Sequence, residues 1–154
     1  MKKIFITIIL SGLFLSCERG RVFHESHEFD GLTWNRFDII EFTADIEETE
    51  DPYDVYLHVR YLQQLPLREF PVNFTITMPS GEMRSADHPL EFFNDDGKPT
   101  GDCMGDLCDL KVLLREEIRF HEPGRVIFEI ENKNTKVSTP GIMEVSLELR
   151  RAGR

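Results

Sequence analysis

The chain has 154 residues, a length typical of one domain and too short for several. Of these residues 40% are hydrophobic and 10% aromatic, enough to build one sizeable core. Glycine and proline contents are ordinary and no repeat or low-complexity tract is present, which excludes collagen-like, solenoid and disordered classes. The formal net charge is -10 at pH 7. Because so acidic a chain repels phosphate polymers and anionic headgroups, its charge argues against nucleic acid or a bare membrane surface as the main partner.

Residues 1–17 have the layout of a bacterial secretory signal. Lys2 and Lys3 give a positive start, residues 4–15 form an apolar run, and Ser16 precedes Cys17. The run is shorter than the roughly 20 residues that a helix needs to cross a bilayer, which disfavours a permanent transmembrane helix. Residues 13–17 resemble the lipobox, whose cysteine receives diacylglycerol. An ordinary secretory signal with an incidental cysteine is the alternative.

Cys17 is therefore the predicted lipidation site, and it divides the chain. We expect a lipoprotein signal peptide at residues 1–16, a lipidated tether at 17–28 and a β domain at 29–151. Removing residues 1–16 takes away two of the 18 basic residues and none of the 28 acidic ones, so the mature charge is -12. One acyl chain binds a membrane reversibly, whereas two or three chains such as palmitate hold a protein there durably. Residues 18–21 show no acidic surface-export signal, which favours an outer-membrane site facing the periplasm.

After Arg36 apolar and polar residues alternate, the pattern of strands with one buried face. The clear segments are residues 40–46, 55–61, 72–78, 126–131 and 142–150, and a weaker one covers 83–93. Residues 94–109 are rich in glycine and aspartate and predict a long ordered or functional loop. Residues 110–120 fit either a bulged strand or a helical turn. About seven or eight short strands predict a mainly β fold, a single antiparallel β-sandwich of immunoglobulin-like or jelly-roll-like type, with an open barrel as the runner-up.

Besides Cys17, the sequence has only Cys103 and Cys108. An exported location permits a disulfide between them, and two free thiols are the alternative. Gly105 would help so short a loop to close. Zinc is disfavoured, because no second cysteine pair or nearby histidine pair completes a set of four ligands.

No arrangement of residues predicts catalysis, and no cofactor is expected. The five histidines are scattered, and His24 with His27, the only close pair, reads as a surface pair. The weak metal candidate is calcium at Asp95, Asp96, Asp102 and Asp106, because Ca²⁺ takes several oxygen ligands from flexible acidic backbone. Solvated surface turns are the alternative.

Three aromatic residues, Trp34, Tyr53 and Tyr56, could form an exposed platform for a sugar or a protein. Residues of this type more often close the edge of a core.

The residues now in view resemble the GldH family of gliding-motility lipoproteins of the Bacteroidota over nearly the whole mature chain. The resemblance is carried by Cys17, residues 29–36 (FDGLTWNR), residues 51–56 (DPYDVY) with Arg60, residues 96–98 (DGK), Gly105 with Asp106, Phe120, Pro123 with Gly124, and residues 141–145 (GIMEV). In its central loop the family tends to read Gly-x-Trp-x-Gly-x-Gly-x-Gly-Asp. Here Pro99 stands at the position of the Trp, Cys103 at that of a Gly and Cys108 at that of an aromatic residue. Compared with the family pattern, the two cysteines therefore resemble a local replacement of these residues by a disulfide.

This resemblance implies a non-catalytic envelope lipoprotein that serves gliding motility and associates with the type IX secretion machinery. Its expected partners are the membrane, through acyl chains on Cys17, and proteins of that machinery. A lipid-anchored, glycan-binding β-sandwich is the competing hypothesis, motivated by the fold class, the aromatic residues and the acidic loop.

Overall fold

Eleven strands and one short 3-10 helix make up residues 20–153, the part of the chain that the computed structural model describes. In chain order these elements are β1 (Arg21–Glu28), η1 (Asp30–Leu32), β2 (Thr33–Asn35), β3 (Ile40–Ile46), β4 (Tyr53–Leu62), β5 (Glu69–Thr77), β6 (Met83–Glu91), β7 (Asp102–Met104), β8 (Leu107–Ile118), β9 (Gly124–Asn132), β10 (Ser138–Pro140) and β11 (Ile142–Arg151).

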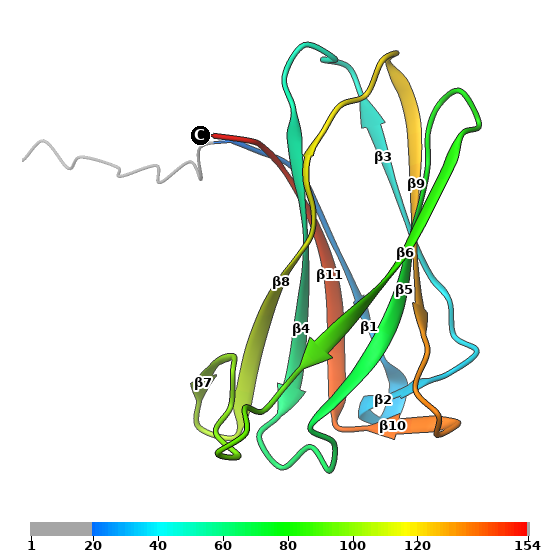
Figure 1. Cartoon of the computed structure of the whole chain (residues 1–154). Coiled ribbons are helices and arrows are strands. Elements are labelled where there is room, and N and C mark those ends of the chain that lie inside the picture. The colour runs from blue at the N-terminus through cyan, green and yellow to red at the C-terminus, as the bar shows by residue number, and fades with distance from the viewer. Residues whose placement is uncertain (1–19, 154) are drawn as a thin grey trace, which may run out of the picture.

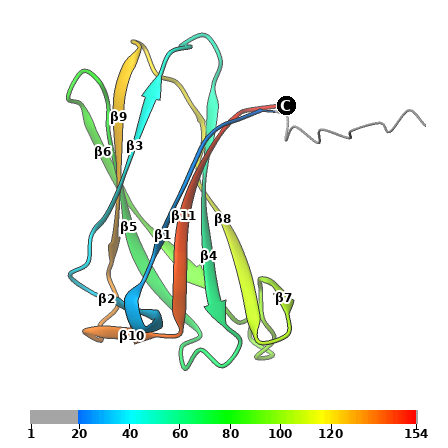
Figure 2. The same ribbon diagram turned by 180° about the vertical axis from the view of Figure 1, so that it is seen from behind.

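The strands form two layers that face each other (Figure 1). One layer is a five-stranded sheet in the order β1-β11-β4-β8-β7, and the other is a four-stranded sheet in the order β3-β9-β5-β6. Strands β2 and β10 pair separately at the end away from the C-terminus, as the view from behind also shows (Figure 2). Every strand pair is antiparallel. The predicted mainly β, antiparallel sandwich is confirmed.

The core lies between the two sheets and is built from the alternation that the sequence displays. Successive side chains of a strand point to opposite faces, so every second residue of β3, β4, β5 and β9 enters the core, and nearly all of these residues are apolar. Aromatic rings dominate the four-stranded side, where Phe74 of β5 stacks on Phe128 of β9 with ring centroids 6.1 Å apart. Strands 40–46, 55–61, 72–78, 126–131 and 142–150 are thus found where the sequence places them, with ends shifted by a few residues.

The boundary expected between tether and domain requires correction. Residues 21–28, expected to belong to a tether that ends at Glu28, form β1 and pair with β11 from Arg21 to Glu28. The strand shows no hydrophobic alternation because it lies at the edge of its sheet, where all its residues except Phe23 are exposed. The folded domain therefore starts at β1, and its last strand ends at Arg151.

The segment 94–109 is also more regular than the expected long loop. Strand β7 and the start of β8 form a hairpin within it, in which Met104 pairs with Leu107 across Gly105 and Asp106. Gly105 has a φ of 62°, a left-handed conformation that glycine adopts without steric cost. A three-residue strand is too short to show alternation, and this explains why the strand count exceeds seven or eight.

The ambiguous segment 110–120 belongs to the long strand β8. Its pairing with β4 shifts register twice, next to Val55, which is the mark of bulges. Glu117 adopts a φ of 50°, and its backbone N–H donates to Asp54 at 2.9 Å. Because the bulges interrupt the two-residue period of a strand, residues 110–120 match neither the strand period nor the helix period. Within residues 20–153, no helix combines the length and the apolar character needed to cross a bilayer.

Candidate functional site on the outer face of the five-stranded sheet

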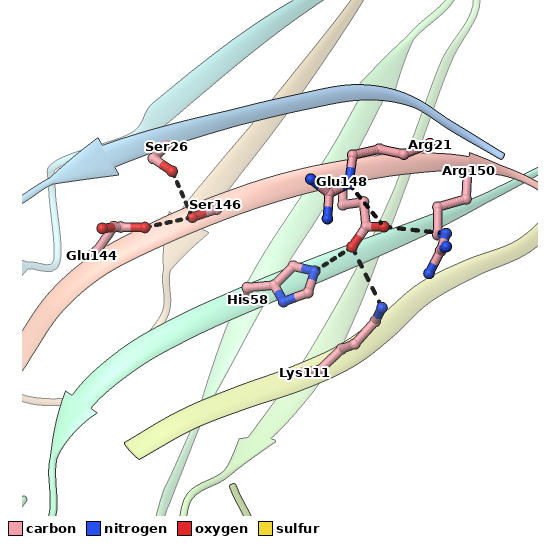
Figure 3. Close-up of polar contacts among 8 residues, drawn as sticks. All are labelled: Arg21, Ser26, His58, Lys111, Glu144, Ser146, Glu148 and Arg150. Carbon is pink, nitrogen blue, oxygen red and sulfur yellow. Dashed lines mark hydrogen bonds and ion pairs between the residues drawn. The ribbon is translucent and has the colours of Figure 1, made fainter. Parts of the chain in front are cut away.

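The outer face of the five-stranded sheet carries a cluster of charged side chains from four neighbouring strands. On β11 the apolar residues point inward, which leaves Glu144, Ser146, Glu148 and Arg150 on the outside (Figure 3). The strand register brings His58 of β4 opposite Ser146 on one side and Lys111 of β8 on the other. These positions lie far apart in sequence and are joined only by strand pairing.

Glu148 is the centre of this cluster and is 1% exposed, although it lies on a solvent-facing side of the sheet. Its Oε2 is 2.6 Å from His58 Nε2 and accepts a hydrogen bond from Lys111 Nζ at 3.4 Å. Its Oε1 lies 3.2 Å from Arg150 Nε and 3.5 Å from Arg21 Nε. Those two contacts are ion pairs without hydrogen-bond alignment, since Oε1 has no hydrogen-bond partner among the described residues.

The surrounding basic groups decide the charge of Glu148. Burial alone raises the pKa of a carboxyl group, but the His58 hydrogen bond and the charge of Lys111 outweigh it and hold the pKa of Glu148 below its usual range. The group is therefore an ionised carboxylate at neutral pH. A carboxylate that is covered and ion-paired is poorly placed to take up a proton from a substrate, so its chemistry here is structural: it fixes the positions of the basic side chains around it.

His58 is the titratable member of the cluster. Burial lowers its pKa, and the positive charge of Lys111 and the neighbouring His24 lower it further against the attraction of Glu148. The rings of His24 and His58 are 6.1 Å apart, and Lys111 Nζ lies 4.1 Å from the ring centre of Tyr56.

A second set of contacts extends the network along the sheet. Ser26 of β1 and Ser146 share a hydrogen bond of 2.9 Å, and Ser146 donates to Glu144 at 2.8 Å. Arg60 of β4 donates to Asp109 at 2.8 Å. A shallow groove runs between the two sets and is lined by His24, His58, Arg60, Asp109, Glu144 and Ser146. The face thus presents an ordered arrangement of both signs of charge.

Of the candidate site residues predicted from the sequence, Tyr56 lies beside this cluster, next to Lys111, and the others that the structure describes lie elsewhere. Cys17, the predicted lipidation site, is outside the described residues. Cys103 and Cys108 are opposite each other in the β7–β8 hairpin and are joined by a disulfide. This bond closes the tip of the sheet on the side away from β1.

The four aspartates considered for calcium do not gather around one point. Asp95 pairs with Arg68 at 2.7 Å, and the backbone N–H of Asp96 donates to Asn94 in a surface turn. Asp102 and Asp106 belong to the β7–β8 hairpin instead. No group of three or more potential metal ligands occurs within residues 20–153.

The suggested aromatic platform does not form, because two of its three side chains, Trp34 and Tyr53, are buried. Trp34 is fully buried, stacks on Phe29 at 5.3 Å and donates its Nε1 proton to the carbonyl oxygen of Asp38. Tyr53 is buried as well, and its hydroxyl donates to the carbonyl oxygen of Glu48 at 2.7 Å. Both side chains close the edge of the core, which was the alternative interpretation.

A buried polar network at the β2–β10 end is another feature that the sequence pattern does not predict. The Asn132 amide donates to the Trp34 carbonyl oxygen and to Thr139, each at 3.2 Å, and its own oxygen accepts the backbone N–H of Asn134. An asparagine two residues before another is the only local hint of such a turn. The network holds β10 and its loop against the core.

Fold and surface together define the class of protein: a small all-β sandwich that presents an ordered charged face. The model of the family described as GldH lipoprotein matches residues 21–149. The chain belongs to this family.

Two relatives from the Bacteroidota support the assignment. The chain is 23% identical over 115 residues to "Gliding motility lipoprotein GldH" of Flavobacterium johnsoniae, covering 75% of this chain and 72% of that protein. It is 23% identical over 133 residues to "Gliding motility lipoprotein GldH homolog" of Christiangramia forsetii, covering 86% and 81%. The predicted family is confirmed.

Among solved structures, the VP2 subviral particle of infectious bursal disease virus overlaps 87% of this chain, with a TM-score of 0.37 and 11% identity. This chain spans only 34% of the length of that one.

Proposed function

We propose that the protein is a non-catalytic interaction component of the gliding machinery, associated with type IX secretion and held on the periplasmic side of the outer membrane by acyl chains on Cys17. The observation that carries the proposal is family membership combined with the names of both relatives, each of which is a gliding motility lipoprotein. The lipobox-like residues before Cys17 support the anchor.

The charged outer face is the contact surface in this proposal. Its side chains are already ordered by ion pairs, so a partner would not have to bear the full cost of immobilising them. Arg60 is suited to contact a partner because it is exposed and stands beside the shallow groove. Interfaces of this kind use charge to select partners and to speed association.

The glycan-binding alternative is not retained. It depends on exposed aromatic rings, and Trp34 and Tyr53 are buried in the core. Tyr56 alone, with Lys111 over its ring, gives no stacking platform for a sugar.

The anchor is tested by Cys17→Ala, expressed in the native organism. We expect the variant to lose labelling by an acyl-chain analogue and to leave the membrane fraction. A variant that stays lipidated or stays with the membrane contradicts the anchor.

The contact face is tested by complementation of a deletion strain. Deletion should abolish or reduce spreading on agar, and Arg60→Glu should fail to restore it at normal protein levels. Arg125→Glu is the matched control, because it reverses the same charge on an exposed residue of the other sheet. Normal spreading of the deletion strain contradicts a role in motility. Full restoration of spreading by Arg60→Glu shows that Arg60 is not part of the contact surface.

A further inference from the structure

The open side of the sandwich between β6 and β8 contains two adjoining hollows. One is lined by the β5–β6 turn and the segment after β8, including Met78, Arg84, Arg119 and His121. The other continues along β8 and shares Arg84, Arg119 and His121 while adding Arg115. Together they form one groove, here called the arginine groove.

The arginines of this groove occupy positions that normally carry apolar residues. Directly opposed residues of an antiparallel pair point to the same face, and Arg84 and His88 of β6 are opposite the fully buried Ile76 and Val72. Arg115 of β8 is opposite the fully buried Val55. Basic groups from both sheets therefore face the inter-sheet side at an edge where β6 is the last strand and β7 covers only the first residues of β8.

Two of these arginines lack a carboxylate partner in an acidic protein. Within residues 20–153, neither Arg115 nor Arg119 makes an ion pair, and Arg119 donates only to the carbonyl oxygen of Glu50 at 3.2 Å. Arg84 is paired with Glu82 at 2.8 Å. His88 Nε2 has no hydrogen-bond partner among the described residues, but it is buried and His88 does not line the groove. The donors without a carboxylate partner therefore belong to Arg115 and Arg119, on β8 and directly after it.

A series of contacts places the arginine groove at the end of the sandwich where the chain enters. The Gly20 carbonyl oxygen accepts the backbone N–H of Arg151, and Arg151 pairs with Glu48 of the β3–β4 loop. The same loop supplies the Glu50 carbonyl oxygen that binds Arg119. If Cys17 is lipidated as proposed, only residues 18–20 separate it from Arg21, the first residue of β1, a span of about 14 Å at most.

We propose that the arginine groove binds a phosphate group, either as free phosphate or in the headgroup of an anionic lipid. Guanidinium groups donate paired hydrogen bonds that match phosphate oxygens, and the apolar Met78 and Ile118 beside them suit the body of a larger ligand. The lining also includes four glutamates, Glu82, Glu116, Glu117 and Glu122, so the groove has no net positive charge. Recognition therefore depends on directed hydrogen bonds from Arg115 and Arg119.

The test is calorimetric titration of the full-length protein as purified from its native envelope, whatever the state of Cys17, in a neutral detergent at constant ionic strength. Three probes are compared: inorganic phosphate, short-chain phosphatidic acid and short-chain phosphatidylcholine. Arg115→Gln and Arg119→Gln each remove one donor from the groove. Arg125→Gln, on the outer face of the four-stranded sheet near the same end, removes the same charge without touching it.

We expect saturable binding of phosphate or phosphatidic acid that Arg115→Gln or Arg119→Gln weakens about tenfold or more, as loss of a charge-assisted hydrogen bond does, while Arg125→Gln has no effect. Tighter binding of phosphatidic acid identifies a headgroup, and equal or weaker binding identifies free phosphate. Absence of saturable binding, equal binding of phosphatidylcholine, or equal loss in Arg125→Gln overturns the proposal. The location beside the membrane rests on the proposed anchor, but the titration does not, so the two can fail separately.

Discussion

The charged cluster around Glu148 makes a sharp stability prediction for the substitution Glu148→Gln. The amide keeps the shape of the carboxylate but removes the charge that holds Arg21, His58, Lys111 and Arg150 together. These four groups then lose the carboxylate that they share.

The cost lies between two limits. Breaking a fully buried ion pair costs about 3–5 kcal/mol, whereas an exposed pair contributes about 0.2–1 kcal/mol. Glu148 is 1% exposed, but Lys111 is 43% and Arg21 is 36% exposed, so these partners regain water when the carboxylate is lost. Three such ion pairs and the His58 hydrogen bond, at roughly 0.5 kcal/mol each, give an expected loss of about 2 kcal/mol in the free energy of unfolding.

Urea titration of a form that begins at Glu18 measures this loss. Trp34 is the single tryptophan and is fully buried, so its fluorescence reports unfolding. The matched control is Glu131→Gln on the other sheet, whose carboxylate has one partly exposed partner, Lys133, and which should change stability by less than about 0.5 kcal/mol. If Glu148→Gln is as stable as the control, the ion pairs of the cluster do not stabilise the fold and do not order this face.

Three further predictions concern pH, the core and the disulfide. Because burial holds the pKa of folded His58 below its unfolded value of 6.5, the unfolded chain binds the proton more readily, so stability should fall as pH drops through 6.5 towards the folded pKa. His58→Gln should remove that part of the slope in urea titrations at several pH values. Trp34→Ala should lower the free energy of unfolding by about 3–5 kcal/mol, because it leaves a large cavity beside Phe29. Urea unfolding monitored by circular dichroism measures this loss. Replacing both Cys103 and Cys108 by alanine should cost only about 2 kcal/mol, since the closed loop is short, and a loss of folding would show that the hairpin matters more than this reasoning allows.

The strands that the sequence predicts well are those whose two faces have different surroundings. Strands β4, β5 and β9 each bury one face in the core and expose the other, so hydrophobicity alternates and the pattern is local. Strand β1 has no such contrast, because an edge strand can satisfy its backbone by pairing with β11 while its side chains stay in solvent.

The charged cluster could not have been predicted by the same means. Glu148 reads as one of several outward-facing polar residues of the last strand, and nothing local distinguishes it from Glu144. Its burial depends on His58 and Lys111, which reach it only after β11 pairs with β4 and β4 pairs with β8. The burial of Trp34 agrees with the general preference of such residues for the edge of a core, but its neighbours are not local, since the Phe70 ring that packs against it comes from a strand far along the chain.

The way β1 joins the sheet bears on how the protein would carry load. On the proposed anchoring, a pull on the lipid enters the domain at Arg21, at one end of β1, and runs along that strand. Strand β1 lies antiparallel to β11 and pairs with it over most of its length, so such a pull acts in shear on several backbone hydrogen bonds at once rather than opening them one by one. The proposed contact face includes β11 and β4, the two strands through which this load would pass. Anchor and contact face are therefore joined by continuous strand pairing, which suits a component that must hold a partner at a membrane.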